Sequence, residues 1–227
     1  MTPNHGFADF DGDGKADSGV FRPGEGYWYI NRSTAGFSAV QWGIATDKLT
    51  PADFDGDNKA DIAVWREDVA TQAAYYILQS STNTVRVELF GQTGDDPTVT
   101  GDWDGNGSDT IGVYRDGSFY LRNSNTVGFA DLVFAFGQPG DQPVVGDWDG
   151  NGTDTIGVYR DGMFLLRNTN TAGVADWRVH AGDGGDQLVD QQHGHGSDDA
   201  PYRHQRSAAR RETYERGLAE GFGELRH

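Results

Sequence analysis

Short runs of apolar residues recur along the chain, and each is bounded by glycine, asparagine, aspartate or serine. Within several runs, apolar and polar residues alternate with a period of two, which predicts β-strands with one buried face. Turns such as Asp116-Gly117 and Asp161-Gly162 separate neighbouring runs, and this residue pair predicts tight hairpins. No helical periodicity of useful length precedes residue 200.

The runs fall into groups of three, with a short fourth run leading into the next group. The first runs are 18–22, 61–66, 110–115 and 155–160, the second are 27–31, 74–80, 118–123 and 163–168, and the third are 38–42, 86–90, 132–136 and 177–181. A Gly-x-x-x-Asp corner follows each third run, beginning at Gly43, Gly91, Gly137 and Gly182. Short fourth strands are expected at 98–100 and 143–145.

These groups are copies of one another. Residues 101–128 and 146–173 differ at only five of 28 positions, and more diverged copies begin at Asp9 and Asp53. The first aspartates of the four copies, at positions 9, 53, 102 and 147, are 44, 49 and 45 residues apart. Four antiparallel strands in about 45 residues is the size of one β-propeller blade.

We therefore expect an all-β chain of four propeller blades. They should occupy about residues 5–47, 48–95, 96–141 and 142–186, followed by a non-repeating tail over 187–227. The blades form either a closed four-bladed ring or part of a larger propeller. The alternatives are a β-solenoid, whose coils are usually shorter, and a β-sandwich, which would not need one loop copied four times.

An aspartate-rich loop opens each copy. Residues 9–17 read DFDGDGKAD and residues 53–61 read DFDGDNKAD, with carboxylates at loop positions 1, 3, 5 and 9. Four carboxylates within nine residues repel one another unless a cation lies between them. Because these loops offer oxygen ligands and no cysteine or histidine, the pattern indicates Ca²⁺ rather than zinc or copper.

The predicted ligands in these two loops come from the side chains and from the carbonyl at position 7. They are Asp9, Asp11, Asp13, Lys15 (carbonyl) and Asp17 in the first loop, and Asp53, Asp55, Asp57, Lys59 (carbonyl) and Asp61 in the second. An EF-hand begins similarly, but it needs a glutamate at position 12, where this chain has Val20 or Val64. A solvated acidic turn without metal is the alternative interpretation.

The third and fourth loops depart from this pattern. Asparagine replaces aspartate at position 5, the last carboxylate comes one place early, and Thr110 or Thr155 stands at position 9. One charge is lost, so weaker calcium binding is expected there. The predicted ligands are Asp102, Asp104, Asn106, Ser108 and Asp109 in the third loop, and Asp147, Asp149, Asn151, Thr153 and Asp154 in the fourth. The sequence thus predicts up to four structural calcium sites.

The DFDGDGKAD loop between predicted strands, together with the Phe-Gly corner, resembles the FG-GAP/VCBS-like repeats, which also build the propellers of integrin α-subunits. The resemblance covers about residues 5–186 and departs at Thr110 and Thr155. It implies propeller blades with Ca²⁺ in the strand-connecting loops. It also implies an extracellular or cell-surface location and a role in adhesion or in carbohydrate or protein binding.

Composition limits the partners. The chain has 35 acidic and 18 basic residues, a formal net charge of −17, which argues against nucleic-acid and anionic-membrane partners. It has no cysteine, which excludes a disulfide framework and cysteine catalysis. No apolar run predicts a membrane span, and the first six residues do not predict a signal peptide.

No catalytic residues are predicted. The chain has no nucleophile elbow, no His-Glu-x-x-His and no phosphate loop, and its aspartates are accounted for by loops that occur four times. The expected function is a non-catalytic binding or adhesion module that recognises a glycan or a protein through its inter-blade loops. A propeller scaffold of a polysaccharide lyase or hydrolase, and a purely structural spacer, are the alternatives.

Two further features recur in the copies. An arginine closes the first run of each copy, at Arg22, Arg66, Arg115 and Arg160, and is predicted to be the structural partner of a nearby carboxylate. Aromatic residues gather in the second runs, at 27–29, 75–76 and 119–120. We expect these aromatic side chains to pack in the core, with stacking on a sugar ring as the alternative.

The tail breaks the pattern. The fifth period begins at Gly182, but the aspartate loop due near residue 192 is missing. Residues 208–215 favour a helix, and Tyr214, Leu218, Phe222 and Leu225 lie on one stripe of it. The tail is either frameshifted or joined from elsewhere, in which case it should be disordered, or a native C-terminal cap.

Overall fold

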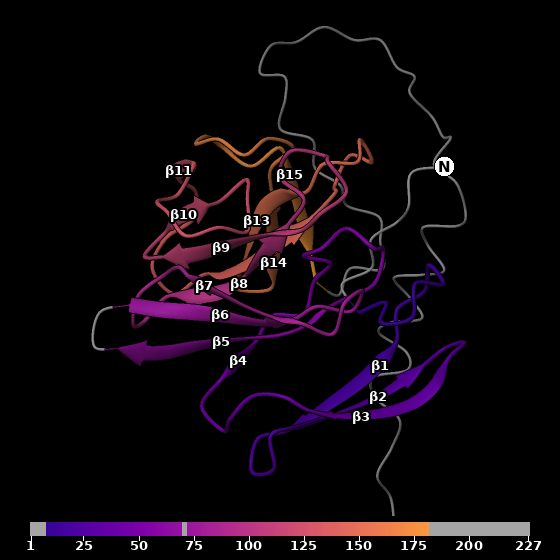
Figure 1. Cartoon of the computed structure of the whole chain (residues 1–227). Coiled ribbons are helices and arrows are strands. Elements are labelled where there is room, and N and C mark those ends of the chain that lie inside the picture. Colours follow the sequence, from indigo (N-terminus) through magenta and orange to yellow (C-terminus); the bar gives the residue numbers. More distant parts are fainter. Residues whose placement is uncertain (1–7, 70–71, 182–227) are drawn as a thin grey trace, which may run out of the picture. The chain divides into compact units, whose positions relative to one another are not determined.

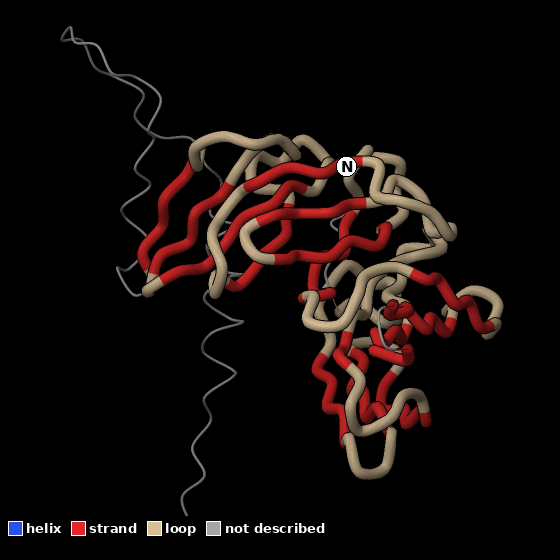
Figure 2. The backbone as a smooth tube through the Cα atoms, turned by 90° about the vertical axis from the view of Figure 1, so that its left-hand side faces the viewer, coloured by secondary structure: helices blue, strands red, loops and turns tan. Residues whose placement is uncertain are grey.

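The computed structural model describes residues 8–69 and 72–181 (Figure 1). These residues belong to the first of two compact units, residues 1–192; the second is residues 193–227. The predicted tail over 187–227 and its helix lie outside the described residues. The described residues form strands and loops without a helix (Figure 2), and none of their elements is a helix able to cross a membrane.

The strands form four separate antiparallel sheets, each made of consecutive strands. The first contains β1 (Ser18–Arg22), β2 (Tyr27–Arg32) and β3 (Gly36–Gln41). The second contains β4 (Lys48–Leu49), β5 (Ile62–Val69), β6 (Gln72–Leu78) and β7 (Val85–Leu89). The third contains β8 (Asp96–Gly101), β9 (Thr110–Arg115), β10 (Ser118–Leu121) and β11 (Leu132–Ala135), and the fourth contains β12 (Gln142–Gly146), β13 (Thr155–Arg160), β14 (Met163–Leu166) and β15 (Trp177–His180).

The all-β propeller prediction is confirmed: the four sheets are four propeller blades, which we number in chain order. In each blade an aspartate-rich loop precedes the first long strand, in the order that the repeats predicted. In the first blade, the described residues supply three of the four strands expected. The predicted hairpins are present, because Asp116 and Gly117 have φ values of 46° and 86°, as a type I′ turn requires.

The hydrophobic core lies between the blades. Side chains on one face of each blade pack against the opposite face of the next, which gives three interfaces. Trp28 and Ile30 of the first blade pack with Ile62 and Val64 of the second. Trp65, Tyr75 and Ile77 of the second pack with Ile111 and Val113 of the third. Tyr114, Phe119 and Leu121 of the third pack with Ile156 and Val158 of the fourth.

An arginine–aspartate pair links each blade to the next. Arg115 of the third blade donates from Nε and a terminal nitrogen to both oxygens of Asp95, at 2.6 and 2.8 Å. Asp95 lies in the Gly-x-x-x-Asp corner that closes the second blade, and its other donor there is the backbone nitrogen of Gln92, 2.9 Å from Oδ2. Equivalent pairs join Arg66 to Asp47 and Arg160 to Asp141.

The prediction that the repeated arginines are structural partners of carboxylates is therefore confirmed at these three positions. The aspartate side chains of the pairs are at most 1% exposed. The corner glycine is required beside them: Gly137 has a φ of 105°, and a Cβ atom there would meet Oδ2 of Asp141 at 2.9 Å.

Candidate metal centre

The loop backbone wraps around the side chain of the first aspartate, which accepts hydrogen bonds from the backbone nitrogens that follow it. Asp9 accepts hydrogen bonds from the backbone nitrogens of Gly12, Asp13 and Gly14, at 2.7, 3.2 and 2.7 Å. Gly12 and Gly14 have φ values of 77° and 82°, a conformation that glycine adopts without strain. The wrapped backbone turns alternate side chains towards a common point.

The second loop repeats this arrangement. Asp53 accepts from the backbone nitrogens of Gly56, Asp57 and Asn58, at 2.7, 3.1 and 2.7 Å. Asn58 takes the place of the second glycine and adopts a φ of 65°, which asparagine tolerates better than most residues. The two loops are therefore the same structure built from slightly different sequences.

Three predicted ligands of each loop converge. Carboxylate oxygens of Asp9, Asp11 and Asp17 lie within 4.8 Å of one another, and so do those of the corresponding residues Asp53, Asp55 and Asp61. Two oxygens bound to one Ca²⁺ are separated by at most about 5 Å, because each lies about 2.3–2.6 Å from the ion. Each of the two clusters can therefore hold a hard cation.

One oxygen in each cluster has no hydrogen-bond donor. Oδ1 of Asp11 and Oδ1 of Asp55 are buried and unpartnered, whereas Oδ2 of each accepts hydrogen bonds. A buried carboxylate oxygen without a donor is unfavourable unless a cation satisfies it. The donor set contains only oxygen, so the residues present fit Ca²⁺.

A second segment of each blade completes the cluster, and the sequence analysis did not identify it. In the first blade, the turn between β2 and β3 donates backbone nitrogens of Thr34 and Ala35 to Asp11 Oδ2, at 2.9 and 2.7 Å. The backbone nitrogen of Ser33 donates to Asp17 Oδ1 at 2.7 Å. The sequence signal was a serine at the same place in two copies, Ser33 and Ser80.

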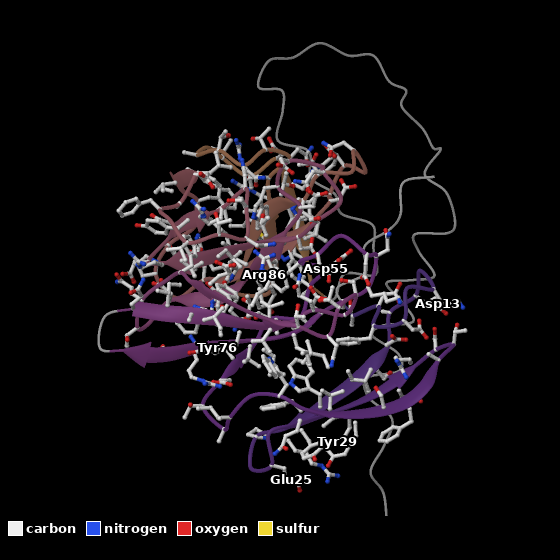
Figure 3. The ribbon with its side chains drawn as sticks, in the orientation of Figure 1. Asp13, Glu25, Tyr29, Asp55, Tyr76 and Arg86 are labelled. Carbon is white, nitrogen blue, oxygen red and sulfur yellow. The ribbon has the colours of Figure 1, made fainter. Side chains whose placement is uncertain are left out.

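The turn between β6 and β7 repeats these contacts in the second blade. Ser80 donates its backbone nitrogen to Asp61 Oδ1 at 2.6 Å, and the Ser81 hydroxyl donates to Asp55 Oδ2 at 2.6 Å. The carboxylates are thus held between two loops of the same blade. Asp13 and Asp55 mark the positions of the two loops in Figure 3.

The aspartate at position 5 lies outside each three-carboxylate cluster. Asp13 Oδ2 accepts from the hydroxyls of Ser33 and Thr34, and Lys15 Nζ lies 3.3 Å from the same oxygen. These hydrogen bonds hold the pKa of Asp13 well below its usual range. The Lys15 side chain is 71% exposed, which leaves its carbonyl as the predicted ligand. Asp13, Asp57 and the two lysine carbonyls remain predicted ligands.

The carboxylates of the site have pKa values shifted in opposite directions, because hydrogen bonds dominate at one and burial dominates at others. Hydrogen bonds, foremost that from the backbone of Ala35, lower the pKa of Asp11. Burial raises the pKa of Asp61 to about 7, and the neighbouring charge of Asp55 acts in the same direction. Burial also raises the pKa of Asp53. A bound divalent cation would offset this penalty, since it favours the charged forms.

The third and fourth loops keep the wrapped backbone but use their last carboxylate differently. Asp102 accepts from Asn106 and Gly107, at 3.0 and 2.7 Å, as Asp9 does from its loop. However, Asp109 Oδ2 accepts from the backbone nitrogen of Asp53 in the preceding blade, at 2.8 Å. Asp154 Oδ2 accepts in the same way from Asp102, at 3.0 Å.

These two carboxylates therefore lie at the junctions between blades. The reciprocal backbone bond is present in both, from Asp109 to Asp53 at 2.7 Å and from Asp154 to Asp102 at 2.8 Å. Within the described part of the chain, three-carboxylate clusters are found in the first two loops only. Calcium binding in the third and fourth loops stays a prediction.

An arginine organises the turn that faces the third loop. At position 9, Thr110 uses its hydroxyl to donate to the carbonyl of Arg122, at 2.7 Å. The Arg122 guanidinium donates to the carbonyls of Phe129 and Thr126 and to the hydroxyls of Ser124 and Thr126. The fourth blade repeats this, with Arg167 donating to the carbonyl of Val174 at 2.6 Å. In the third and fourth blades, a guanidinium therefore stabilises this turn. In the first two blades, the equivalent turn contacts the carboxylates of the aspartate loop.

Comparison with known protein families agrees with this geometry. Residues 9–64, which contain both three-carboxylate loops and the first blade, match the model of the FG-GAP-like repeat family. This segment of the chain is therefore similar to an FG-GAP-like repeat. The resemblance predicted from the aspartate loops is thus confirmed for this repeat, and the other blades share its propeller fold. No curated protein matches the chain.

Proposed function

We propose that the chain is a non-catalytic, calcium-stabilised binding module. The observation that carries this proposal is the pair of three-carboxylate clusters, in which Asp11 and Asp55 each bury an oxygen that has no donor. Calcium would satisfy that oxygen and neutralise the loop. The ion would then hold the aspartate loop against the turn that follows the second long strand of the same blade.

The proposed role of the metal is structural. Each carboxylate of the clusters accepts at least one backbone hydrogen bond from its own blade, so these carboxylates hold the loop and the turn in place. Metal binding that occurs only in the folded chain adds directly to the free energy of unfolding. A carboxylate arrangement that is repeated in successive blades is also unlike a catalytic pair, which should occur once.

We place the module outside the cell or at its surface. Extracellular calcium modules have dissociation constants of about 10⁻⁴–10⁻³ M, so such sites fill outside cells and stay empty in the cytosol. The FG-GAP-like repeat supports this location.

The proposed ligand is a glycan or a protein surface, contacted by the loops at the ends of the blades. Phe129 is 94% exposed and Val174, at the equivalent place in the next blade, is 71% exposed. Their carbonyls are the acceptors of Arg122 and Arg167, so each exposed side chain stands on a turn held by a guanidinium. Rigid loops with exposed apolar tips are suited to binding, because little conformational entropy is lost.

Thermal unfolding of the full chain with calcium and with a chelator tests the metal. At about 10 mM Ca²⁺ and a dissociation constant of about 0.1–1 mM, each site adds roughly 1.4–2.7 kcal/mol. Two sites should raise the melting temperature by about 10 °C. An unchanged melting temperature would contradict the calcium module.

A glycan array probed in calcium tests the ligand. Phe129→Ser should weaken whatever binding is found, whereas Val85→Ser, which changes a residue 54% exposed on β7, should not. Equal binding by both variants would contradict the role assigned to the loops.

A further inference from the structure

The first blade leaves exposed a face that the later blades bury. Val20 in β1 is 61% exposed, whereas Val64, Val113 and Val158, at the same place in the later blades, are at most 1% exposed. In each later blade, this valine packs against the preceding blade. The first blade has the same surface, and among the described residues no blade covers it.

Aromatic side chains extend this face. Tyr29, which pairs with Val20 across the sheet, stacks on Tyr27 and Phe37 with ring centroids 5.8 and 6.3 Å apart. Phe37 is 67% exposed. In the second blade, the counterpart Tyr76 packs into the cluster shared with the first blade. Figure 3 shows Tyr29 on the side of the first sheet that faces away from the second, and Tyr76 between the two sheets.

The arginine of this face also differs from its counterparts. Arg22 lies over the Tyr29 ring at 4.7 Å, just as Arg66 lies over Tyr76 at 4.5 Å. Arg66 is held by the buried Asp47 of the preceding blade. Arg22 instead has Glu25 of its own turn at 3.8 Å, with both side chains more than half exposed. This face of the first blade therefore has both the apolar surface and the arginine that the later blades use to pack on the blade before them.

The fourth blade carries the complementary half of such an interface. In the third blade, Tyr114, Phe119 and Leu121 are at most 5% exposed, because the fourth blade covers them. Their counterparts in the fourth blade, Tyr159, Phe164 and Leu166, are only partly buried. Tyr159 and Phe164 keep the same tilted contact, at 5.0 Å, that Tyr114 and Phe119 make at 4.8 Å.

We propose that two copies of the chain associate head to tail, with the fourth blade of each packed on the free face of the first blade of the other. The three interfaces inside the chain are the template for this contact. In the same chain the first-blade face is exposed and the fourth-blade face is only partly buried, so these described faces do not cover each other within one copy. Two copies form the smallest assembly in which every first-blade face and every fourth-blade face is covered. This assembly is a ring of eight blades, a number found in known propellers.

The mass of the full chain in solution tests this proposal. Sedimentation at tens of micromolar protein, in calcium and about 0.15 M salt to screen the net negative charge, should give twice the chain mass of 24.7 kDa. Val20→Glu should shift the mass to that of one chain while the β-sheet circular dichroism is unchanged, because the residue is exposed within one copy. A single-chain mass for the unmodified protein would overturn the proposal.

A matched control separates a specific interface from a general effect of charge. Val133 on β11 is 58% exposed but belongs to an outer strand of an internal blade, so Val133→Glu should leave the dimer intact. Loss of the dimer in both variants, or in neither, would contradict an interface at the first blade.

Mixing two variants tests the head-to-tail arrangement. Phe164→Glu damages the fourth-blade face and should, like Val20→Glu, give single chains. An equimolar mixture of the two should regain dimers, because the intact fourth blade of one variant meets the intact first blade of the other. A mixture that stays at the single-chain mass, or assemblies that grow beyond two copies, would overturn the closed head-to-tail ring.

Discussion

At the scale of single residues, position 3 of the aspartate loops is the most informative. Asp11 and Asp55 each use one oxygen to hold the adjacent turn and leave the other buried without a donor. The same position in the third loop, Asp104, accepts a hydrogen bond from Asn106 at 3.3 Å through its Oδ1. One aspartate position therefore has two environments in one chain.

Asparagine at position 3 tests this difference. Asp11→Asn and Asp55→Asn should each remove about half of the rise in melting temperature that calcium produces, because each removes one charged ligand from one site. Asp104→Asn makes the same change in the third loop and should preserve the full rise. Thermal unfolding with calcium and with a chelator measures all three. An equal loss for Asp104→Asn would contradict the assignment of calcium to the first two loops.

The pKa of Asp61 predicts how stability depends on pH when calcium is absent. Burial raises this pKa from 3.8 to about 7 in the folded chain. The protonated carboxyl then favours the folded state, fully below pH 3.8 and progressively less as the pH rises through 7. The free energy of unfolding should fall between pH 5 and 7, by up to about 1.4 kcal/mol per pH unit from this group.

Urea unfolding in chelator at a series of pH values measures this slope. Asp61→Asn should reduce this slope, because the amide does not titrate, and should leave the part contributed by Asp109, whose pKa burial also raises to about 7. Calcium should reverse the trend, since it binds the deprotonated form and its affinity rises with pH. A stability that is flat or rises from pH 5 to 7 in the calcium-free protein would contradict the buried, calcium-dependent role of Asp61.

At the scale of elements, the arginine–aspartate pairs join one blade to the next. The pKa of Arg115 is raised by its hydrogen bonds to Asp95. For Asp141, burial by itself would raise the pKa, but hydrogen bonds from Arg160 and the Gln138 backbone outweigh it, and the pKa is lowered. Both shifts show that the charged pair is the stable form at neutral pH.

Removing one partner of such a pair should be costly. Arg115→Gln leaves the buried Asp95 carboxylate without its charged partner, and breaking a buried pair in this way costs about 3 kcal/mol. Arg178→Gln removes an exposed charge from β15 and should cost less than about 0.5 kcal/mol. Denaturant unfolding of both variants measures the difference, and equal stability of the two would contradict a structural role for the pair.

Much of this element-scale structure was predictable from the sequence. The period-two alternation, the Asp-Gly turns and the repeated aspartate loops predicted the strands and blades, because each depends on residues close together in the chain. The partners of Arg66, Arg115 and Arg160 were predicted only as nearby carboxylates. Identifying them as the corner aspartates of the preceding blade required the packing of one blade on another.

The site was less predictable for the same reason. The contribution of Ser33 and Ser80 depends on a turn 16 to 19 residues away from the carboxylates that it contacts. Asp109 was predicted as a ligand of its own loop, but it contacts the backbone of Asp53, 56 residues earlier. Sequence spacing identified the first two loops correctly as clusters of carboxylates but contained no information about contacts between blades.

At the scale of the whole molecule, the four blades combine two ways of holding the same turn. The first two blades hold it through the carboxylates of the aspartate loops, and the last two hold it through Arg122 and Arg167. Calcium should therefore stabilise one half of the described chain more than the other. The exposed faces of the first and fourth blades add a second whole-molecule property, the association of two copies.

The most direct test of the central claim is the number of calcium ions bound per chain, measured by isothermal titration calorimetry on the full chain. We expect two ions, and one in Asp11→Asn and in Asp55→Asn. No binding would contradict the calcium module, and four ions of equal affinity would contradict the distinction between the first and the last pair of loops.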